Sequence, residues 1–415
     1  MNKTKKGSPL KRNAALTLGA MGVVYGDIGT SPIYAFNEAV HAGGDTRSEI
    51  LGVLSLVFWT LTIVVSIKYL IFVLNADNKG EGGTLAMFSQ FSEKIRTGRK
   101  GLMGFTVFIF LMAAALEFAD GILTPAISVT SAVEGVKTIS PDLAFLVVPL
   151  TVLILAVLFI FQFKGTHKIG TIFGPVMVLW FFVIGFMGVS QIIKNPDSLV
   201  ALNPLYALKF IEAHSFQTLF VMSSVILAVT GAEALYSDLG HFGKGPIRFG
   251  WFALAGLALP LNYFGQGALL LRDPSAHGNT FFGMAGPGLP ALALLLVTTF
   301  ATIIASQALI SAVASLASQA VQLGFLPRIR IQHTNKQERG QIYVPFVNAA
   351  VGLGAIALVV IFKSSSALAG AYSLSIAGTM LVSTIGLIIL AVSKWKAQKF
   401  ILLPIFTVFL ILDLS

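Results

Sequence analysis

Eleven long apolar runs, separated by short polar connections, constrain the fold of this 415-residue chain more than any other feature. Charged residues make up only 11% of the chain, against about 25% in a typical soluble domain. An apolar run of about 20 residues crosses a bilayer as one helix. We therefore expect an all-α polytopic membrane protein. The runs cover residues 14–40, 50–74, 103–132, 143–163, 169–192, 215–237, 250–271, 289–320, 344–362, 366–391 and 398–415.

The basic residues predict the orientation of these runs. If the N-terminal segment 1–13 is cytoplasmic, 21 of the 28 Lys and Arg residues fall in cytoplasmic segments and 6 in extracellular ones. Such a bias is the usual signature of membrane topology. The net charge of +10 is thereby explained without a nucleic-acid partner, and the chain is placed in the cell membrane. The absence of cysteine excludes disulfides and thiolate metal sites.

Two of the runs are interrupted by glycine and proline. The first reads GVVYGDIGTSPIY over residues 22–34, and the sixth reads AVTGAEALYSDLG over residues 228–240. Broken helices at corresponding positions, five spans apart, are typical of transporters built from two inverted five-helix repeats. The eleventh run reaches the last residue, so we expect the natural protein to continue. The predicted parts are 1–13, the cytoplasmic N-terminus; 14–192, the first repeat; 193–214, an extracellular connection; 215–391, the second repeat; and 392–415, the start of additional spans.

Acidic residues fall inside these runs, where an ionised side chain costs about 2.5–3.5 kcal/mol on insertion scales. They are Asp27 in the first run, Glu117 and Asp120 in the third, and Glu233 in the sixth. Lys68 is the one base at similar depth, and we expect it near a helix end. The acids are therefore expected to lack internal counter-ions and to be neutralised by a proton or by a transported cation.

Oxygen-bearing residues accompany the acid of the third run. Asp120, Thr124 and Ser128 are spaced four residues apart and share one helical face. Pro125 is expected to unwind the helix locally and to free backbone carbonyls. Carboxylate, hydroxyl and carbonyl oxygens suit an alkali or alkaline-earth cation better than a soft transition metal. Hydrogen bonding of each hydroxyl to its own helix is the alternative.

The break in the first run offers similar groups. Asp27 is followed by Thr30, Ser31 and Tyr34, and the interrupted backbone adds carbonyl oxygens. We therefore include these residues in the candidate cation site. A protonated structural acid remains the alternative for Asp27.

The motifs then show a resemblance to a known family. The chain resembles the KUP/HAK/KT potassium uptake permeases, a branch of the amino acid–polyamine–organocation (APC) superfamily. The resemblance covers nearly the whole chain. The blocks that carry it are GVVYGDIGTSPIY, NKGEGGTLAMFS, DGILTPAISVTSAVEG, VTGAEALYSDLGHFGKGPIR, NYFGQGALLL, IASQALISAVASLASQAVQLGFLPRIRIQHT and GQIYVPFVN.

This resemblance implies a LeuT-like 5+5 inverted repeat with spans 1 and 6 unwound, and low-affinity potassium uptake by K⁺/H⁺ symport rather than enzymatic activity. It places Thr230 and Tyr372 in the potassium site and gives Glu233 a role in proton coupling, with Asp120 as a second candidate. Glu117 departs from the family pattern, which usually has a non-acidic residue there, and is a further candidate proton site. The implied potassium ligands are Asp27, Tyr34, Asp120, Thr124, Ser128, Thr230 and Tyr372.

The expected mechanism is alternating access. Two carboxylates beside one monovalent ion repel each other, which favours protonation of one of them. No cofactor is expected beyond the transported K⁺ and the coupling H⁺. The bilayer is the expected environment, with rubidium and caesium as further candidate ions. Sodium as the coupling ion, a homodimer, and inhibition by cyclic di-AMP as in some Gram-positive relatives stay open.

Three alternatives differ in their chemistry. A cationic amino-acid or polyamine permease on the same fold is not excluded by charge. A K⁺ channel is disfavoured because the sequence has no selectivity-filter repeat and the helices are broken. An intramembrane aspartyl protease needs YD and GxGD settings, and neither YGD at Tyr25–Asp27 nor LEFAD at Leu116–Asp120 matches them.

Overall fold

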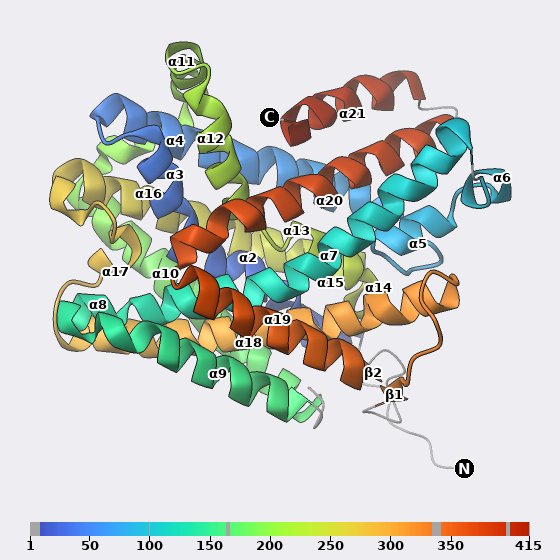
Figure 1. Cartoon of the computed structure of the whole chain (residues 1–415). Helices are drawn as coiled ribbons and strands as arrows, with labels where there is room; N and C mark the ends of the chain where they lie inside the picture. The colour runs from blue at the N-terminus through green and yellow to red at the C-terminus, as the bar shows by residue number, and fades with distance from the viewer. Residues whose placement is uncertain (1–8, 99, 163–166, 334–341, 396–398, 415) are drawn as a thin grey trace.

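The computed structural model describes residues 9–98, 100–162, 167–333, 342–395 and 399–414. Within these ranges the chain is almost entirely helical, apart from a short antiparallel ladder between β1 (Gln332–His333) and β2 (Ile342–Tyr343) (Figure 1). Nine of the described helices are long and apolar enough to cross a membrane. The prediction of an all-α polytopic protein is therefore confirmed, whereas residues 1–8 of the expected cytoplasmic N-terminus lie outside the described part.

The first and the sixth apolar runs are each divided into short helices, as their glycines predict. The first consists of α1 (Pro9–Val23), α2 (Gly26–Thr30), η1 (Ser31–Ile33) and α3 (Ala35–Gly43). The sixth consists of α12 (Gln217–Val225), η7 (Ile226–Val229) and α13 (Ala232–Ser237). Gly231 joins the last two with a φ of +78°, a conformation that glycine adopts without steric cost.

The other predicted spans form longer helical segments, whose bounds agree with the sequence within a few residues. Some change pitch, since η2 and η8 are π-helical stretches in series with α-helices. The segments are α4 (Arg47–Thr60) with η2 (Leu61–Phe72) and η3 (Val73–Asn75), α7 (Gly101–Glu134), α9 (Val147–Phe161), α10 (His167–Lys194), α15 (Lys244–Gly250) with η8 (Trp251–Ala255) and α16 (Gly256–Arg272), α18 (Leu289–Gln322), α19 (Pro345–Phe362), α20 (Ser365–Ser393) and α21 (Lys399–Leu414).

Short elements join the spans at their two ends. α21, which corresponds to the eleventh predicted run, has 16 residues and is shorter than the nine spanning helices. The connecting elements are α5 (Thr84–Ser89), α6 (Glu93–Arg96), α8 (Val136–Ile139), η4 (Pro141–Leu146), η6 (Pro196–Leu202), α11 (Leu205–Ala213), α14 (Leu239–Phe242), η9 (Pro274–Ala276) and α17 (Thr280–Gly283).

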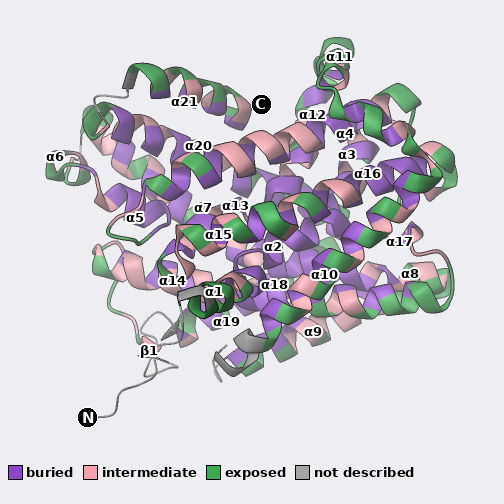
Figure 2. Ribbon diagram, turned by 180° about the vertical axis from the view of Figure 1, so that it is seen from behind, coloured by how far each residue is buried: buried purple, intermediate pink, exposed green. Residues whose placement is uncertain are grey.

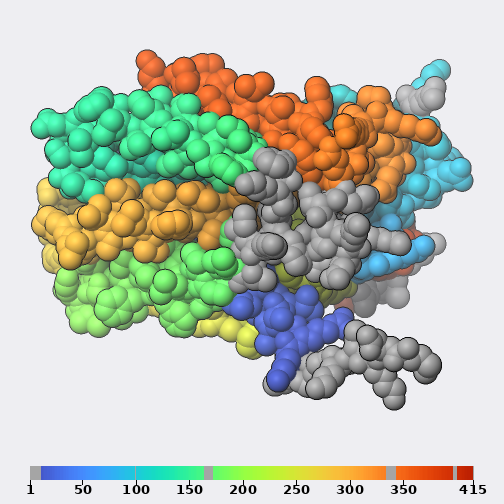
Figure 3. Space-filling model, turned by 90° about the horizontal axis from the view of Figure 1, so that it is seen from below, coloured from blue at the N-terminus to red at the C-terminus, as the bar shows by residue number. Residues whose placement is uncertain are grey.

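Apolar side chains lie both inside and outside this bundle. Buried residues run through its centre, while the outer helices alternate exposed and buried positions (Figure 2). The face formed by α9, α18 and α10 is shown in Figure 3. Large side chains such as Ile160, Phe186 and Leu296 are exposed on these helices. Exposed aliphatic and aromatic residues on long helices suit contact with lipid rather than with water.

Glycines let α10 and α16 cross closely. A Cβ atom added at Gly265 would contact the backbone of Gly188, and one added at Gly188 would contact the Leu261 carbonyl. Small residues at such crossings allow membrane helices to pack backbone against backbone. α10 lies beside the first broken span, so this crossing also supports the site described below.

Replacing Gly265 by Val is therefore expected to force α10 and α16 apart and to destabilise the fold by at least about 1–3 kcal/mol. Thermal unfolding of purified protein in detergent, followed by tryptophan fluorescence, measures the effect as a lower Tm. The matched control is Gly370→Ala on the exposed side of α20, where an added Cβ meets nothing within 4 Å. Equal Tm values for the two variants would contradict the close crossing.

Candidate functional site

The two broken helices meet at the centre of the molecule. A Cβ atom added at Gly231 would lie 2.7 Å from the Ile28 nitrogen and 3.0 Å from Asp27 Cβ, so glycine is needed here for space as well as for its φ angle. Across this contact, Ser31 Oγ and Thr230 Oγ1 are 2.5 Å apart. The backbone breaks of spans 1 and 6 are thus in direct contact.

Two side chains from other spans hold the first break in place. Trp180 of α10 donates its indole N–H to the Gly29 carbonyl at 2.8 Å. Gln266 of α16 donates to the Pro32 carbonyl at 2.9 Å. Unwound backbone in a membrane needs such partners, because lipid offers none. These bonds therefore stabilise the segment that carries Asp27.

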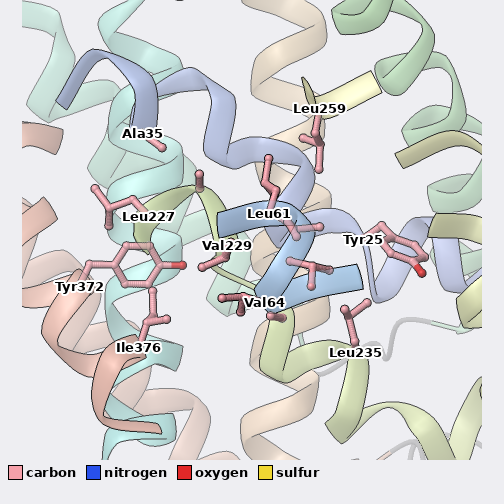
Figure 4. Close-up of a cluster of buried hydrophobic side chains, with 14 of the residues drawn as sticks. Tyr25, Ala35, Leu61, Val64, Leu227, Val229, Leu235, Leu259, Tyr372 and Ile376 are labelled. Carbon is pink, nitrogen blue, oxygen red and sulfur yellow. The ribbon is translucent and has the colours of Figure 1, made fainter. Parts of the chain in front are cut away.

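A chain of oxygen atoms links Asp27 to Asp120. The Tyr372 hydroxyl lies 3.2 Å from Asp27 Oδ1 and 3.4 Å from Oδ2. Thr124 Oγ1 lies 2.7 Å from the Tyr372 oxygen and 2.9 Å from Asp120 Oδ1. Figure 4 shows the Tyr372 side chain projecting from α20, with Leu227 and Ile376 beside it. Asp27, Thr124 and Tyr372 are buried. The two hydroxyl groups therefore connect Asp27 to Asp120 through hydrogen bonds that are shielded from bulk solvent.

The number of protons in this chain is informative. Three contacts join Asp27, Tyr372, Thr124 and Asp120, but the two hydroxyl groups supply only two protons. A third proton on either carboxyl group completes the set of hydrogen bonds and lowers the charge of the pair from −2 to −1. The arrangement therefore has a place for one added proton and leaves one negative charge for a cation.

The remaining predicted ligands differ in how well their hydroxyls are satisfied. Ser128 Oγ is buried and has no hydrogen-bond partner in the described part of the chain, which suits a hydroxyl that binds a ligand. Tyr34 is buried, and its hydroxyl lies 3.5 Å from Thr230 Oγ1. Thr30 instead donates to the Asp27 carbonyl at 2.9 Å. The Thr30 hydroxyl is thus hydrogen-bonded to the backbone of its own segment.

Glu233 and Glu117 form a second acidic group near Asp120. The Tyr69 hydroxyl donates to Glu233 Oε1, and Ser383 donates to the same atom at 2.9 Å. Glu233 Oε2 is buried without a partner among the described residues. Thr84 donates to Glu117 Oε1. The three acids Glu117, Asp120 and Glu233 line one cavity of about 50 Å³.

A glycine-rich loop borders this cavity. Gly82 and Gly83 line it, and a Cβ atom added at Gly82 would collide with the Tyr236 carbonyl of α13. Asp77, in the same loop, accepts a hydrogen bond of 2.7 Å from Lys244. Partial burial raises the pKa of Asp77, but the hydrogen bonds from Lys244 and from the Gly80 N–H together outweigh it and hold the pKa below its ordinary value. The ion pair thus holds the loop against α13, the second half of span 6.

A second cavity, of about 400 Å³, lies at the C-terminal end of α7. Tyr34 lines it together with Glu38 and Glu134. Ser365 and Ser366, at the start of α20, each donate to one of these acids at 2.5 Å. The cavity therefore approaches the Asp27 site from one side, while the cavity with Glu233 approaches Asp120 from the other.

The structure shows one ion pair that was not predicted and corrects one expectation. Lys68 is fully buried in η2 and forms an ion pair with Asp413 of α21, with 2.7 Å between Lys68 Nζ and each carboxylate oxygen. This pair joins spans far apart in sequence, and it involves none of the four acids that were expected to lack internal counter-ions. Contrary to expectation, α7 is not unwound at Pro125 and remains helical from Gly101 to Glu134. Proline lacks an N–H, so one carbonyl is left free without a break in the helix.

Several residues at the site were not predicted as functional residues. Tyr69, Ser383 and Thr84, which bind the two glutamates, and Asp413, which binds Lys68, are the clearest examples. An aspartate within the eleventh apolar run was a usable signal for Asp413, since charged residues are rare in such runs. Hydroxyl residues are common in membrane helices, so the sequence carried no comparable signal for the other three.

The chain has clear relatives among known proteins. Residues 14–415 match the family described as the K⁺ potassium transporter integral membrane domain. The chain is 50% identical over 400 residues to the probable potassium transport system protein Kup 2 of Mesorhizobium japonicum, covering 96% of this chain and 62% of that protein. It is 48% identical over 399 residues to the probable potassium transport system protein Kup 1 of Paramagnetospirillum magneticum, covering 95% and 62%. The chain thus spans less than two thirds of the length of these curated relatives.

A solved structure is similar in fold. A mutant form of the manganese transporter of Eremococcus coleocola matches with a TM-score of 0.50 and 14% identity, covering 100% of this chain and 88% of that chain. At this level of identity the similarity concerns the fold alone.

Replacing Tyr372 by Phe should disconnect Asp27 from Thr124 and weaken cation binding. Purified protein is expected to lose most of the increase in Tm that potassium chloride produces over choline chloride at equal ionic strength, because a ligand stabilises only the state that binds it. The control is Tyr263→Phe, since Tyr263 is also buried but its hydroxyl has no partner within the described ranges. A full potassium response in Tyr372→Phe would separate this hydroxyl from the cation site.

Proposed function

This chain belongs to the family of K⁺ potassium transporters, and from that premise we propose that it carries potassium into the cell by secondary active K⁺/H⁺ symport. The observation that carries the proposal is the chain of hydroxyl groups joining two intramembrane aspartates, Asp27 and Asp120, at the contact of two broken helices. This function is transport and not enzymatic catalysis.

Potassium is proposed to bind among the oxygen atoms at this contact. Carboxylate, hydroxyl and carbonyl oxygens replace the hydration shell of a hard cation, as alkali ions require. The unpartnered hydroxyl of Ser128 and the carboxylate of Asp27 support the assignment most directly. Thr30 supports the site through its contact with the Asp27 carbonyl. The proposed ligand side chains are Asp27, Tyr34, Asp120, Thr124, Ser128, Thr230 and Tyr372.

Charge balance supports coupling to a proton. One potassium ion and one proton together neutralise the two aspartates, and the added proton also completes their hydrogen-bond chain. Glu233 is the first candidate for the acid that exchanges this proton with the cavity that it lines, which we call the inner cavity, because its Oε2 atom is buried without a partner in the described structure. Asp120 is the second candidate, and Glu117 lines the same cavity.

We further propose that the two cavities are the outer and inner vestibules of an alternating-access transporter in the LeuT-like class of the APC superfamily. Residues 14–192 and 215–391 would be its two inverted repeats, and 193–214 the extracellular connection between them. The paired breaks at Asp27 and Gly231 support this division. The excess of Lys and Arg supports a cytoplasmic N-terminus and a cytoplasmic glycine-rich loop.

The two rival transport functions are less well supported. A channel would need a water-filled path, yet Tyr34, Thr124 and Tyr372 are buried side chains between the two cavities. A polyamine permease would need a longer binding space than the compact hydroxyl chain between Asp27 and Asp120. Competition by putrescine or lysine in the uptake assay below separates this permease from a potassium transporter.

Rubidium uptake into proteoliposomes tests the proposed activity. An inward proton gradient is expected to accelerate uptake by the wild type. Asp27→Asn should reduce uptake about tenfold or more, because charged contacts contribute roughly 1.5–3 kcal/mol. Asp142→Asn, an exposed acid in η4, is the matched control and should transport normally. Uptake by Asp27→Asn equal to that of the wild type would remove Asp27 from the site.

Glu233→Gln tests the proton-coupling role separately. The neutral amide cannot exchange a proton, so rubidium uptake should become insensitive to the imposed pH gradient while rubidium exchange at equal pH continues. Glu93→Gln, in the exposed helix α6, is the control and should retain the wild-type response. A normal gradient response in Glu233→Gln would move the coupling role to Asp120 or Glu117.

A further inference from the structure

A buried ion pair joins the peripheral helix α21 to the centre of the bundle. Lys68 in η2 and Asp413 in α21 have side chains that are 0% and 2% exposed, and they are 2.7 Å apart. Lys68 also donates to the Met380 carbonyl at 3.1 Å, and Thr384 donates to Asp413 at 2.5 Å. Among the described residues, the polar contacts of this pair come from η2, α20 and α21.

Apolar packing already holds α21 against the bundle at this place. The ring of Phe72 in η2 packs against Phe406 and Phe409 of α21, with centroid distances of 5.3 and 5.8 Å. Figure 1 shows α21 lying alongside α20 at the edge of the molecule. Because burying two charges is costly and well-packed apolar residues can often replace a buried ion pair, attachment of α21 does not by itself explain the pair.

The same two elements that bind Asp413 also bind Glu233, through the neighbouring residue in each case. In η2, Lys68 binds Asp413 and Tyr69 binds Glu233. In α20, Thr384 binds Asp413 and Ser383 binds Glu233. The two carboxylates therefore sit beside adjacent residue pairs, one with an ammonium group and the other with hydroxyl groups only.

This arrangement determines the partner of the lysine. If Asp413 lost its charge, the Lys68 ammonium would be buried without a counter-ion, and the nearby Glu233 carboxylate, with its unpartnered Oε2, would be the available replacement. A Glu233 carboxylate paired with an ammonium group would no longer take up a proton readily.

We propose that Asp413 is a positioning residue for proton coupling, which retains the Lys68 ammonium on the α21 side so that Glu233 stays free to exchange a proton. The proposal rests on the symport proposed above and extends it to a helix outside the ten core spans. Asp413 itself contacts neither the proposed cation ligands nor the inner cavity.

Other ionisable groups also surround Glu233 and belong to the same balance. Glu117 and Asp120 of α7 line the inner cavity with Glu233, as do Asp238 and His241, which are 3.3 Å apart. Tyr236 is on the same short helix as Glu233, and Tyr69 donates to its carboxylate from η2. Lys68 is the nearby base, and its partner is Asp413. A substitution of Asp413 therefore changes the charge around Glu233 through Lys68 alone.

Infrared difference spectroscopy of the purified, full chain in lipid tests this directly. The C=O band of protonated Glu233 is identified by its absence in Glu233→Gln and is titrated with pH. In Asp413→Asn the midpoint of this titration should fall by roughly one pH unit or more, the usual size of a close charge pair. In the double variant Lys68→Met/Asp413→Asn, which removes the competing ammonium, the midpoint should return to about that of the wild type. Asp413→Glu should behave as the wild type.

Controls and contrary results are defined in advance. Asp197→Asn breaks the exposed ion pair with Arg47, 2.6 Å apart, and should leave the band unchanged. If Asp413→Asn does not fold, Thr384→Val takes its place and should shift the midpoint in the same direction by a smaller amount. An unchanged midpoint in whichever of these two variants folds, or no recovery in the double variant, overturns the proposal.

The band also separates this proposal from the proposed transport function. If the wild type fails to take up rubidium while the midpoint shifts as expected, the symport proposal fails and the positioning of Lys68 stands. If wild-type uptake is normal and gradient-dependent while the midpoint is unchanged in Asp413→Asn, the symport proposal stands and the proposed role of Asp413 fails. If both proposals hold, the midpoint of Glu233 shifts in Asp413→Asn, and rubidium uptake by this variant no longer depends on the pH gradient.

Discussion

The contact between the two broken helices determines the rest of this structure. Gly231 approaches Asp27 and Ile28 so closely that a single methyl group would separate them. Because the backbone of the first span is interrupted here, its carbonyl groups need partners, and Trp180 and Gln266 provide them from neighbouring spans. The surrounding helices thus stabilise the interrupted backbone by supplying the hydrogen-bond donors that lipid does not offer.

Hydroxyl groups, rather than bases, accompany most of the intramembrane acids. A lysine beside Asp27 would compensate the charge permanently and leave nothing for the proposed cation to neutralise. Tyr372 and Thr124 instead link Asp27 to Asp120 without adding charge. Within the described chain, one buried lysine is paired with an acid. It is Lys68, and its partner Asp413 lies on the peripheral helix α21. The charged site and the compensated pair are thereby kept separate.

The sequence predicted the helices and their interruptions well, because both depend on local composition. Apolar length gave the spans, and Gly231 with Gly26 and Pro32 gave the two breaks. The acid in the first break predicted Asp27, and the resemblance to a known family added Tyr372; these residues are 345 positions apart and in contact. The Lys68–Asp413 pair was missed, since a single sequence does not give the relative depth of two spans. Pro125 was expected to unwind its helix, but α7 stays helical through it.

One helix contacts five of the acids discussed above. Over its first twenty residues, α20 presents Ser365 to Glu134, Ser366 to Glu38, Tyr372 to Asp27, Ser383 to Glu233 and Thr384 to Asp413. These nineteen steps span about 28 Å at 1.5 Å per residue, close to the thickness of the hydrocarbon core. A shift of α20 along its own axis would therefore change the partners of five carboxylates at once. Contacts near the two faces of the membrane therefore depend together on the position of one helix, α20.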